Sequence, residues 1–396
     1  MGVGELLLPI AAFGGSLCAV ATAAAAPMSF RLDHVSFFSG DETFIHDVSL
    51  ELERGSMNVL LGPTLSGKTT LMRLMAGLDR PSSGRVIADG CDVTGVPVRR
   101  RSVAMVYQQF INYPSLTVYE NIASPLRVAG VRREQLDGRV REAARVLGLE
   151  PLLKRLPAQL SGGQQQRTAI ARAIVKRADL VLLDEPLANL DYKLREELRE
   201  ELPRILKASG AILVYATTEP PEALQLGGNT ATLWQGRVIQ FGPTSAVYHR
   251  PDHIDSARVF SDPPLNEIAL SKRGEIAEFG QFHRAPVIGR LAGLADGDYT
   301  IGFRGNAAGL DRPFAQSIDL AGRISVAEIS GSESFVHVET ALGVFVCVEP
   351  GVSARQPGQT VDLHIDATRV LVFDRSGARV AAPGERWEAG GGANNA

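Results

Sequence analysis

The stretch that decides the fold is Gly62-Pro63-Thr64-Leu65-Ser66-Gly67-Lys68-Thr69, which follows a short apolar run at residues 57–61. It fits the phosphate-binding pattern G-x-x-x-x-G-K-[S/T]. In such loops backbone N–H groups wrap the phosphates of a nucleotide, the lysine places a charge on them, and the last hydroxyl binds Mg²⁺. A helix expected over 69–75 aims its positive end at the same phosphates. The alternative is a glycine-rich turn with an incidental lysine, and the flanking strand and helix count against it.

We therefore predict a site for ATP and Mg²⁺ at this loop. The predicted ATP contacts are Gly62, Pro63, Thr64, Leu65, Ser66, Gly67, Lys68, Thr69 and Thr70.

Two carboxylates, Asp184 and Glu185, directly follow a second apolar run at residues 180–183. Asp184 is predicted to hold Mg²⁺ through water, together with Thr69. Glu185 is predicted to be the catalytic base that polarises the attacking water in phosphoryl transfer. An acidic helix cap at a strand end is the alternative. The phosphate loop upstream favours the metal and base roles.

The apolar runs at 57–61, 180–183 and 212–215 are continuous, which is typical of strands buried on both faces of a parallel sheet. Residues 140–149 and 192–208 separate them with helical patterns, the second rich in Glu and Arg at helical spacing. A parallel sheet covered by helices binds its ligands at the carboxyl ends of its strands. Both the phosphate loop and the acidic pair follow such ends.

Composition narrows the class of protein. The 396 residues are long enough for two domains. A formal net charge of −3 gives no support for nucleic-acid binding through a basic surface. The three cysteines, Cys18, Cys91 and Cys347, are scattered and form neither a disulfide framework nor a metal-ligand spacing. A reducing compartment fits them best.

Residues 6–26 are almost wholly apolar, which alone would suit a membrane span or signal peptide. No Lys or Arg precedes them, and secretion would remove the chain from ATP. We expect translation to begin at Met28, so that residues 1–27 are a non-native extension. A disordered or membrane-touching extension, and true secretion, are the alternatives.

Changes in residue composition along the chain divide it into regions. Residues 28–248 are expected to form the α/β nucleotide-binding domain. Residues 249–380 are punctuated by Gly and Pro and carry short β-rich runs, which predicts a small all-β domain with the form of a barrel. Residues 381–396 are rich in Gly, Ala and Asn and are expected to be disordered.

A third motif discriminates between families. Leu160-Ser161-Gly162-Gly163-Gln164 is a Ser-Gly-Gly turn opening a helix, and so a second anion site. Two such sites make sense if two ATPase domains face each other and each lends this turn to the other's nucleotide. Together with the phosphate loop, the glutamine in Val106-Tyr107-Gln108-Gln109 and the strand end at 182–186, it resembles the ATP-binding subunits of ABC transporters. The dimer-facing stretch at 188–191 extends the resemblance.

The resemblance implies an ABC-type helical subdomain, a Mg²⁺ contact for Gln108, and docking of the following segment on membrane subunits. Residues 113–121 look like that segment in sugar importers. The β-rich region resembles the regulatory domain of the same importers, where Ile301-Gly302-Phe303-Arg304 matches a family strand but Gly305-Asn306 replaces the usual Pro-Glu.

Three positions depart from the family pattern. Leu65 stands where these loops usually have glycine, so the loop must be formed with negative φ there or with strain. The adenine-stacking aromatic is replaced by Ser39, and Phe38 or Phe37 is the candidate to stack instead, although a buried strand phenylalanine is the alternative. Thr218 takes the place of the switch histidine, and the sequence has no histidine between His46 and His249.

The resemblance therefore implies an importer ATPase of the carbohydrate or polyol class, with glycerol favoured. Its partners would be a second ABC ATPase, two membrane-spanning permease subunits and an extracytoplasmic solute-binding protein, at the cytoplasmic face of the membrane and without nucleic acid. Thr218 predicts a weakened own site and favours a heterodimer. The alternatives are a catalytically silent regulatory subunit and a non-transport ABC ATPase acting on nucleic acid or the ribosome.

Overall fold

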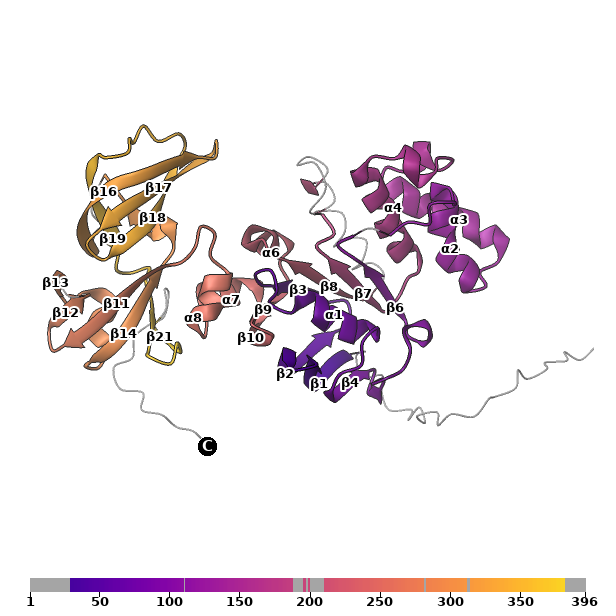
Figure 1. Cartoon of the computed structure of the whole chain (residues 1–396), viewed down its shortest axis with the longest axis horizontal. Helices are drawn as coiled ribbons and strands as arrows, with labels where there is room; N and C mark the ends of the chain where they lie inside the picture. Colours follow the sequence, from indigo (N-terminus) through magenta and orange to yellow (C-terminus); the bar gives the residue numbers. More distant parts are fainter. Residues whose placement is uncertain are drawn as a thin grey trace, which may run out of the picture.

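The computed structural model describes residues 29–109, 111–187, 195–196, 199, 210–280, 283–311 and 314–381. Three sequence expectations, for 1–27, for the dimer-facing stretch 188–191 and for most of the helix 192–208, lie outside these ranges, as does the tail beyond residue 381. Within them the element order alternates strands and helices up to residue 259, and is β-rich afterwards. Figure 1 shows a central α/β body with a helical cluster at one end and the β-rich part at the other.

The central sheet has six strands in the order β10-β9-β3-β8-β7-β6. Five of its strands, β6, β7, β8, β3 and β9, are parallel to one another, and the edge strand β10 is antiparallel to β9. The bounds are β3 Met57–Leu61, β6 Val103–Val106, β7 Leu180–Asp184, β8 Ile212–Thr217, β9 Asn229–Trp234 and β10 Arg237–Pro243. The predicted parallel sheet is confirmed, because each of the three apolar runs forms one of its strands.

A second, antiparallel sheet covers the phosphate-loop helix. Its order is β2-β1-β4-β5, with β1 Ser29–Ser39, β2 Glu42–Glu53, β4 Ser83–Ala88 and β5 Cys91–Asp92. Helix α1, Lys68–Ala76, lies between the two sheets and buries Leu71, Met72, Leu74 and Met75 in a core that both sheets share. This packing holds the start of α1 at the carboxyl end of β3.

The helical subdomain consists of α2 Val118–Val128, α3 Arg133–Val146 and α4 Gly162–Val175, which pack on one another beyond β6 (Figure 1). Thr117 caps α2, because its side chain accepts from the Glu120 N–H while the Glu120 carboxylate accepts from the Thr117 N–H. The helix predicted at 140–149 begins earlier and ends at Val146.

The β-rich region contains two antiparallel sheets that share one core. The first, β13-β12-β11-β14-β20-β21, has bounds His283–Pro286, Ile276–Phe279, Asn266–Arg273, Gly297–Phe303, Leu371–Phe373 and Arg379–Ala381. The second, β15-β19-β16-β17-β18, has bounds Ala308–Gly309, Thr360–Asp366, Ser317–Ile329, Glu333–Thr340 and Gly343–Pro350. The expected all-β region is confirmed, with two sheets around its core.

Helix α6, Pro220–Leu226, connects β8 to β9, and two short helices, α7 Thr244–His249 and α8 Ile254–Val259, join the two regions. Val259 and Phe260 pack against Val59 of β3, whereas Ile254 and Ala257 of α8 pack with Leu371 and Phe373 of the β-rich region. Helix α8 therefore belongs to both cores, and the division proposed at residue 248 falls inside this shared layer.

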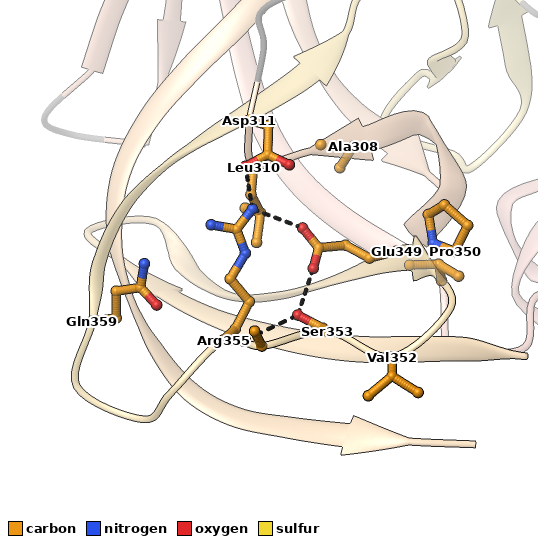
Figure 2. A pocket seen from close by; sticks show the side chains of 12 residues that line it. Ala308, Leu310, Asp311, Glu349, Pro350, Val352, Ser353, Arg355 and Gln359 are labelled. Atoms are coloured by element: carbon orange, nitrogen blue, oxygen red, sulfur yellow. Dashed lines mark hydrogen bonds and ion pairs between the residues drawn. The ribbon is translucent and has the colours of Figure 1, made fainter. Parts of the chain in front are cut away.

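An ion-pair network stabilises the loop between β18 and β19. The guanidinium of Arg355 pairs with Asp311 and, at 3.1 Å, with Glu349, whose other oxygen accepts from the Ser353 hydroxyl at 2.7 Å. Figure 2 shows these side chains turned toward one another at one wall of an open pocket.

Candidate functional site: the phosphate loop and its carboxylates

Two glycines allow the loop to close between β3 and α1. A Cβ at Gly62 would lie 2.5 Å from the Leu233 carbonyl oxygen and from the Ser66 hydroxyl. Gly67 has φ of 100°, and a Cβ there would lie 2.9 Å from Ile45. A side chain at Gly62 would collide with the backbone of β9, and the φ of Gly67 is one that other residues rarely adopt, so both glycines are required by geometry.

Leu65 adopts φ of 67°, in the left-handed region, and its side chain is 96% exposed. Of the two possibilities that the sequence left open, negative φ or strain, the structure shows the strained one. Glu185 also has a positive φ, 45°, and its N–H donates to the Ala216 carbonyl at 3.0 Å. Strain of this kind is common where a loop positions functional groups.

Replacing Leu65 by glycine is expected to raise the melting temperature. Left-handed backbone costs a non-glycine residue about 1–2 kcal/mol, and glycine's extra entropy in the unfolded chain offsets about 0.5–1 kcal/mol of that. Because the leucine side chain is exposed, no packing is lost, and a net gain of about 0.5–1 kcal/mol remains. Thermal unfolding measures it. Val352→Gly, at an exposed residue without positive φ, is the control and should lower the melting temperature. A lower value for Leu65→Gly would contradict the strain.

Lys68 lies at the centre of the site. It is 5% exposed, and its ammonium donates to the carbonyl oxygens of Gly62 at 2.8 Å and Pro63 at 3.0 Å and lies 3.9 Å from a Glu185 oxygen. Burial lowers the pKa of Lys68, and the charges of Glu185 and Asp184 oppose that shift. The loop therefore aims one desolvated cation at the space where phosphates are expected.

The acidic strand end meets the loop from β7. The Thr69 hydroxyl donates to Asp184 at 2.8 Å, and the Gln108 amide donates to Glu185 at 2.8 Å. The structure thus brings together all of the predicted metal contacts, Thr69, Gln108 and Asp184, with the predicted base. The donor set suits Mg²⁺, which prefers oxygen ligands and takes few from protein when phosphates and water supply the rest. Among the described residues no group of three His, Cys, Asp or Glu side chains could hold a metal ion.

Burial raises the pKa of both carboxyl groups. For Asp184 the Thr69 hydroxyl and Lys68 lower it again in part. For Glu185 the Lys68 charge opposes the shift, whereas Asp184, Glu222 and Glu219 add to it. A raised pKa makes Glu185 a stronger base when it is ionised.

The site opens into a cavity of about 570 Å³. Its lining joins the loop and α1 to β2, to the residues that follow β6, β7 and β8, and to the turn between β9 and β10. The lining residues are Glu42, Thr43, Phe44, His46, Thr64, Leu65, Gly67, Lys68, Thr69, Thr70, Gln108, Glu185, Thr218, Gln235 and Gly236. Thr218 is thus where the sequence predicted it, facing the same space as Lys68 and Glu185.

The aromatic residue at this cavity differs from the one predicted. Phe38, proposed to stack on adenine, is 55% exposed on β1, with its N–H on the Ser82 hydroxyl, and it does not line the cavity. Phe44 and His46 of β2 do. Phe44 and His46 flank the fully buried Ile45, and side chains two residues apart on a strand lie on the same face, opposite Ile45. Only the packing of β2 against the loop turns that face toward the cavity.

Phe44→Ala is expected to weaken ATP binding by about tenfold, because stacking of a base on an aromatic ring contributes about 1–3 kcal/mol. Phe38→Ala is the matched control on the neighbouring strand and should leave the affinity unchanged. Equilibrium binding of a fluorescent ATP analogue measures both dissociation constants. Loss of affinity in Phe38→Ala alone would restore the original assignment.

The signature lies apart from this cavity. Leu160 is buried, and Ser161 caps α4: its hydroxyl accepts from the backbone N–H of Gln164 at 3.4 Å, and the side-chain Oε1 of Gln164 accepts from the Ser161 N–H at 3.1 Å. Ser161 and Gly162 are exposed. The capping box presents the turn Ser161-Gly162-Gly163 to solvent at the positive end of a 14-residue helix.

A groove of about 400 Å³ opens between α4 and the sheet. Ile111, 61% exposed, and Tyr113, 46% exposed, line it with Met105 and Arg172. The Arg172 guanidinium lies 4.4 Å from the centre of the Tyr113 ring and donates to the Ile111 carbonyl. The predicted docking segment therefore begins at an apolar groove.

Comparison with known proteins agrees with this geometry. The ABC transporter family matches residues 45–188, and the TOBE domain matches residues 318–372. The trehalose/maltose import ATP-binding protein MalK of Thermococcus litoralis is 36% identical over 87% of this chain and 97% of its own. The sulfoquinovosyl glycerol transport protein SmoE of Agrobacterium fabrum is 34% identical, over 85% and 94%. The Fe(3+) ions import protein FbpC 1 of Rhizobium meliloti is 35% identical over the same shares.

A solved structure, the dimeric ATP-binding cassette MJ0796 in a post-hydrolysis state with ADP and Pi, matches 54% of this chain with 30% identity and a TM-score of 0.50. The match covers 98% of the length of that cassette. The chain belongs to the ATP-binding subunits of ABC transporters, ATPases coupled to transmembrane transport, and carries a C-terminal TOBE domain. Among the described residues no helix is both long and apolar enough to cross a bilayer.

Proposed function

We propose that this chain hydrolyses ATP to energise the uptake of a sugar or polyol, as one of two ATPase domains docked on membrane subunits at the cytoplasmic face. The observation that carries the proposal is the joint placement of Lys68, the Thr69–Asp184 pair and the Gln108–Glu185 pair around one cavity. These are the cation, the oxygen donors and the base that phosphoryl transfer needs.

The residues divide the work. Lys68 and the N–H groups of the loop bind and orient the phosphates, and neutralise charge that develops on them. Thr69, Gln108 and Asp184 would hold Mg²⁺, which supplies electrostatic stabilisation to the phosphates when bound. The Glu185 carboxylate takes the proton of the attacking water at its oxygen, and Gln108 holds that carboxylate at 2.8 Å.

The Ser161 turn is proposed to serve the partner's nucleotide, because it faces solvent and does not line the chain's own cavity. Thr218 is neutral and shorter than histidine, so the site on Lys68 is proposed to be the weaker of two. We favour a heterodimer whose other ATPase carries the histidine, with this chain completing its partner's site.

The membrane partner is proposed to dock in the groove of Ile111 and Tyr113, where exposed apolar side chains lie beside the segment that begins at Gln108. A shift of this segment would move Gln108 and, through their hydrogen bond, Glu185. Docking and catalysis are thereby linked mechanically.

Glycerol or a glycerol derivative is proposed as the solute within the sugar and polyol class. The Thr217-Thr218-Glu219-Pro220 stretch, together with residues 107–114, resembles one of the paired ATPases of bacterial glycerol importers, and a relative is named for sulfoquinovosyl glycerol transport. Relatives of similar identity are named for trehalose/maltose import and for Fe(3+) ion import. Because similar ATPases go with such different solutes, we infer that the membrane and solute-binding subunits select the solute.

The test is reconstitution with a second ATPase, the permease subunits and the solute-binding protein of the same transporter. ATP turnover should rise when the loaded binding protein is added to the complete assembly, with glycerol compared against maltose. Equal turnover by the isolated chain would contradict the heterodimer. ATP binding without turnover in every assembly would instead favour a silent regulatory subunit.

A further inference from the structure

A buried carboxylate lies directly behind Thr218. Glu222, in the first turn of α6, is 5% exposed. It accepts from the Thr217 hydroxyl at 2.5 Å, the Tyr215 hydroxyl at 3.2 Å and the Arg199 guanidinium at 3.0 Å. A carboxylate that receives three donors away from water is held in one position, because moving it would leave buried polar groups without partners.

The Thr217 hydroxyl passes this restraint to the backbone. While it donates to Glu222, it also accepts from the N–H of Glu219 at 3.0 Å. The two residues that flank Thr218 are therefore fastened to each other and to Glu222. Thr218 lies between them, exposed, and lines the nucleotide cavity. The direction in which residue 218 projects is thus set by a hydrogen-bonded turn.

Glu222 also binds Arg199, which lies in the part of the chain between β7 and β8. The Arg199 guanidinium, 9% exposed, also donates to Gln225 at 2.6 Å and to Glu196 at 2.5 Å. Arg195 adds a second contact, 3.5 Å from Glu219. Two ion pairs therefore join residues 195–199 to the turn and helix around Thr218.

We propose that Glu222 is a positioning residue for ATP hydrolysis, which fixes the turn that presents residue 218 to the nucleotide and ties it to Arg199. The proposal rests on the ATPase function proposed above. The hydrogen bonds that hold the turn are present although threonine has replaced the expected histidine. The turn therefore still directs the side chain of residue 218 toward the nucleotide.

The experiment compares Glu222→Gln with the wild-type full-length chain in its transporter assembly. We expect turnover to fall by about tenfold to a hundredfold, as for a misplaced catalytic environment, with the ATP dissociation constant unchanged. Glu349→Gln, another carboxylate ion-paired to arginine but in the β-rich region, is the matched control and should change neither turnover nor the dissociation constant. Unchanged turnover in a folded Glu222→Gln chain would overturn the proposal.

A second pair of variants guards against misfolding of Glu222→Gln. Thr217→Val removes the bridging hydroxyl at nearly constant shape, and Thr217→Ser keeps it. Turnover should fall in the valine variant and be retained in the serine variant, with both variants folded at the assay temperature. Equal turnover in both would overturn the proposal. A wild-type assembly that binds ATP but never hydrolyses it would instead count against the proposed function itself.

Discussion

Glu185→Gln is expected to lower ATP turnover by about a hundredfold to ten-thousandfold, which is what a positioned general base contributes. Glutamine retains the shape and can still bond to Gln108, but it cannot take a proton from water. ATP binding should persist, because Lys68 and the loop are untouched. Single-turnover hydrolysis of radiolabelled ATP, beside equilibrium binding, separates the two effects.

The pH profile gives this prediction a second arm. Burial raises the pKa of Glu185, so the wild-type turnover number should fall as the pH drops through a midpoint above the ordinary value of 4.5. Glu185→Gln should lose that limb. Glu267→Gln, which removes a carboxylate paired with Arg258 outside the site, is the control and should keep wild-type turnover and profile. Retained turnover in Glu185→Gln would remove this carboxylate from the base role.

Thr218→His is expected to raise turnover at this chain's own site. Losing one positioned polar group in a catalytic site commonly costs about two to three orders of magnitude, and restoring it should recover part of that, at least about tenfold. The exposed position, the turn held by Thr217 and Glu222, and the cavity of about 570 Å³ leave space for an imidazole beside Lys68 and Glu185.

Thr43→His is the matched control, because Thr43 lines the same cavity from β2. It should not raise turnover, and the double variant Thr218→His with Glu185→Gln should show no gain over Glu185→Gln alone. The measurement is steady-state phosphate release by the transporter assembly. An unchanged rate in Thr218→His would contradict the idea that this site is limited by the missing histidine.

Much of the site could be predicted because its motifs are local. A loop such as Gly62–Thr69 determines its own backbone path: glycine is required at 62 and 67, and the lysine and hydroxyl follow at fixed spacing on the first turn of α1. Asp184 and Glu185 could be placed because a buried parallel strand ends there. Continuous apolar runs likewise predicted the strands of the central sheet.

Other features depend on residues far apart in the chain. The sequence favoured Phe38 because it lies beside Ser39, the family's aromatic position, and only the packing of β2 on the loop brings Phe44 to the cavity instead. The sequence alone is compatible with two backbone conformations at Leu65, and the closed loop in the structure has the one with φ of 67°. Helix α8 contacts two cores, which no change of composition near residue 248 reveals.

The sequence by itself determined which chemical groups this protein has, the order in which they occur and the absence of a histidine at position 218. The tertiary structure decided which of them meet. Gln108 reaches Glu185 and Thr69 reaches Asp184 because parallel strands bring their carboxyl ends to one edge of the sheet. Arg199 reaches Glu222 through packing between two helical segments. The physical reason is that motifs record neighbours along the chain, whereas burial and packing determine neighbours in space.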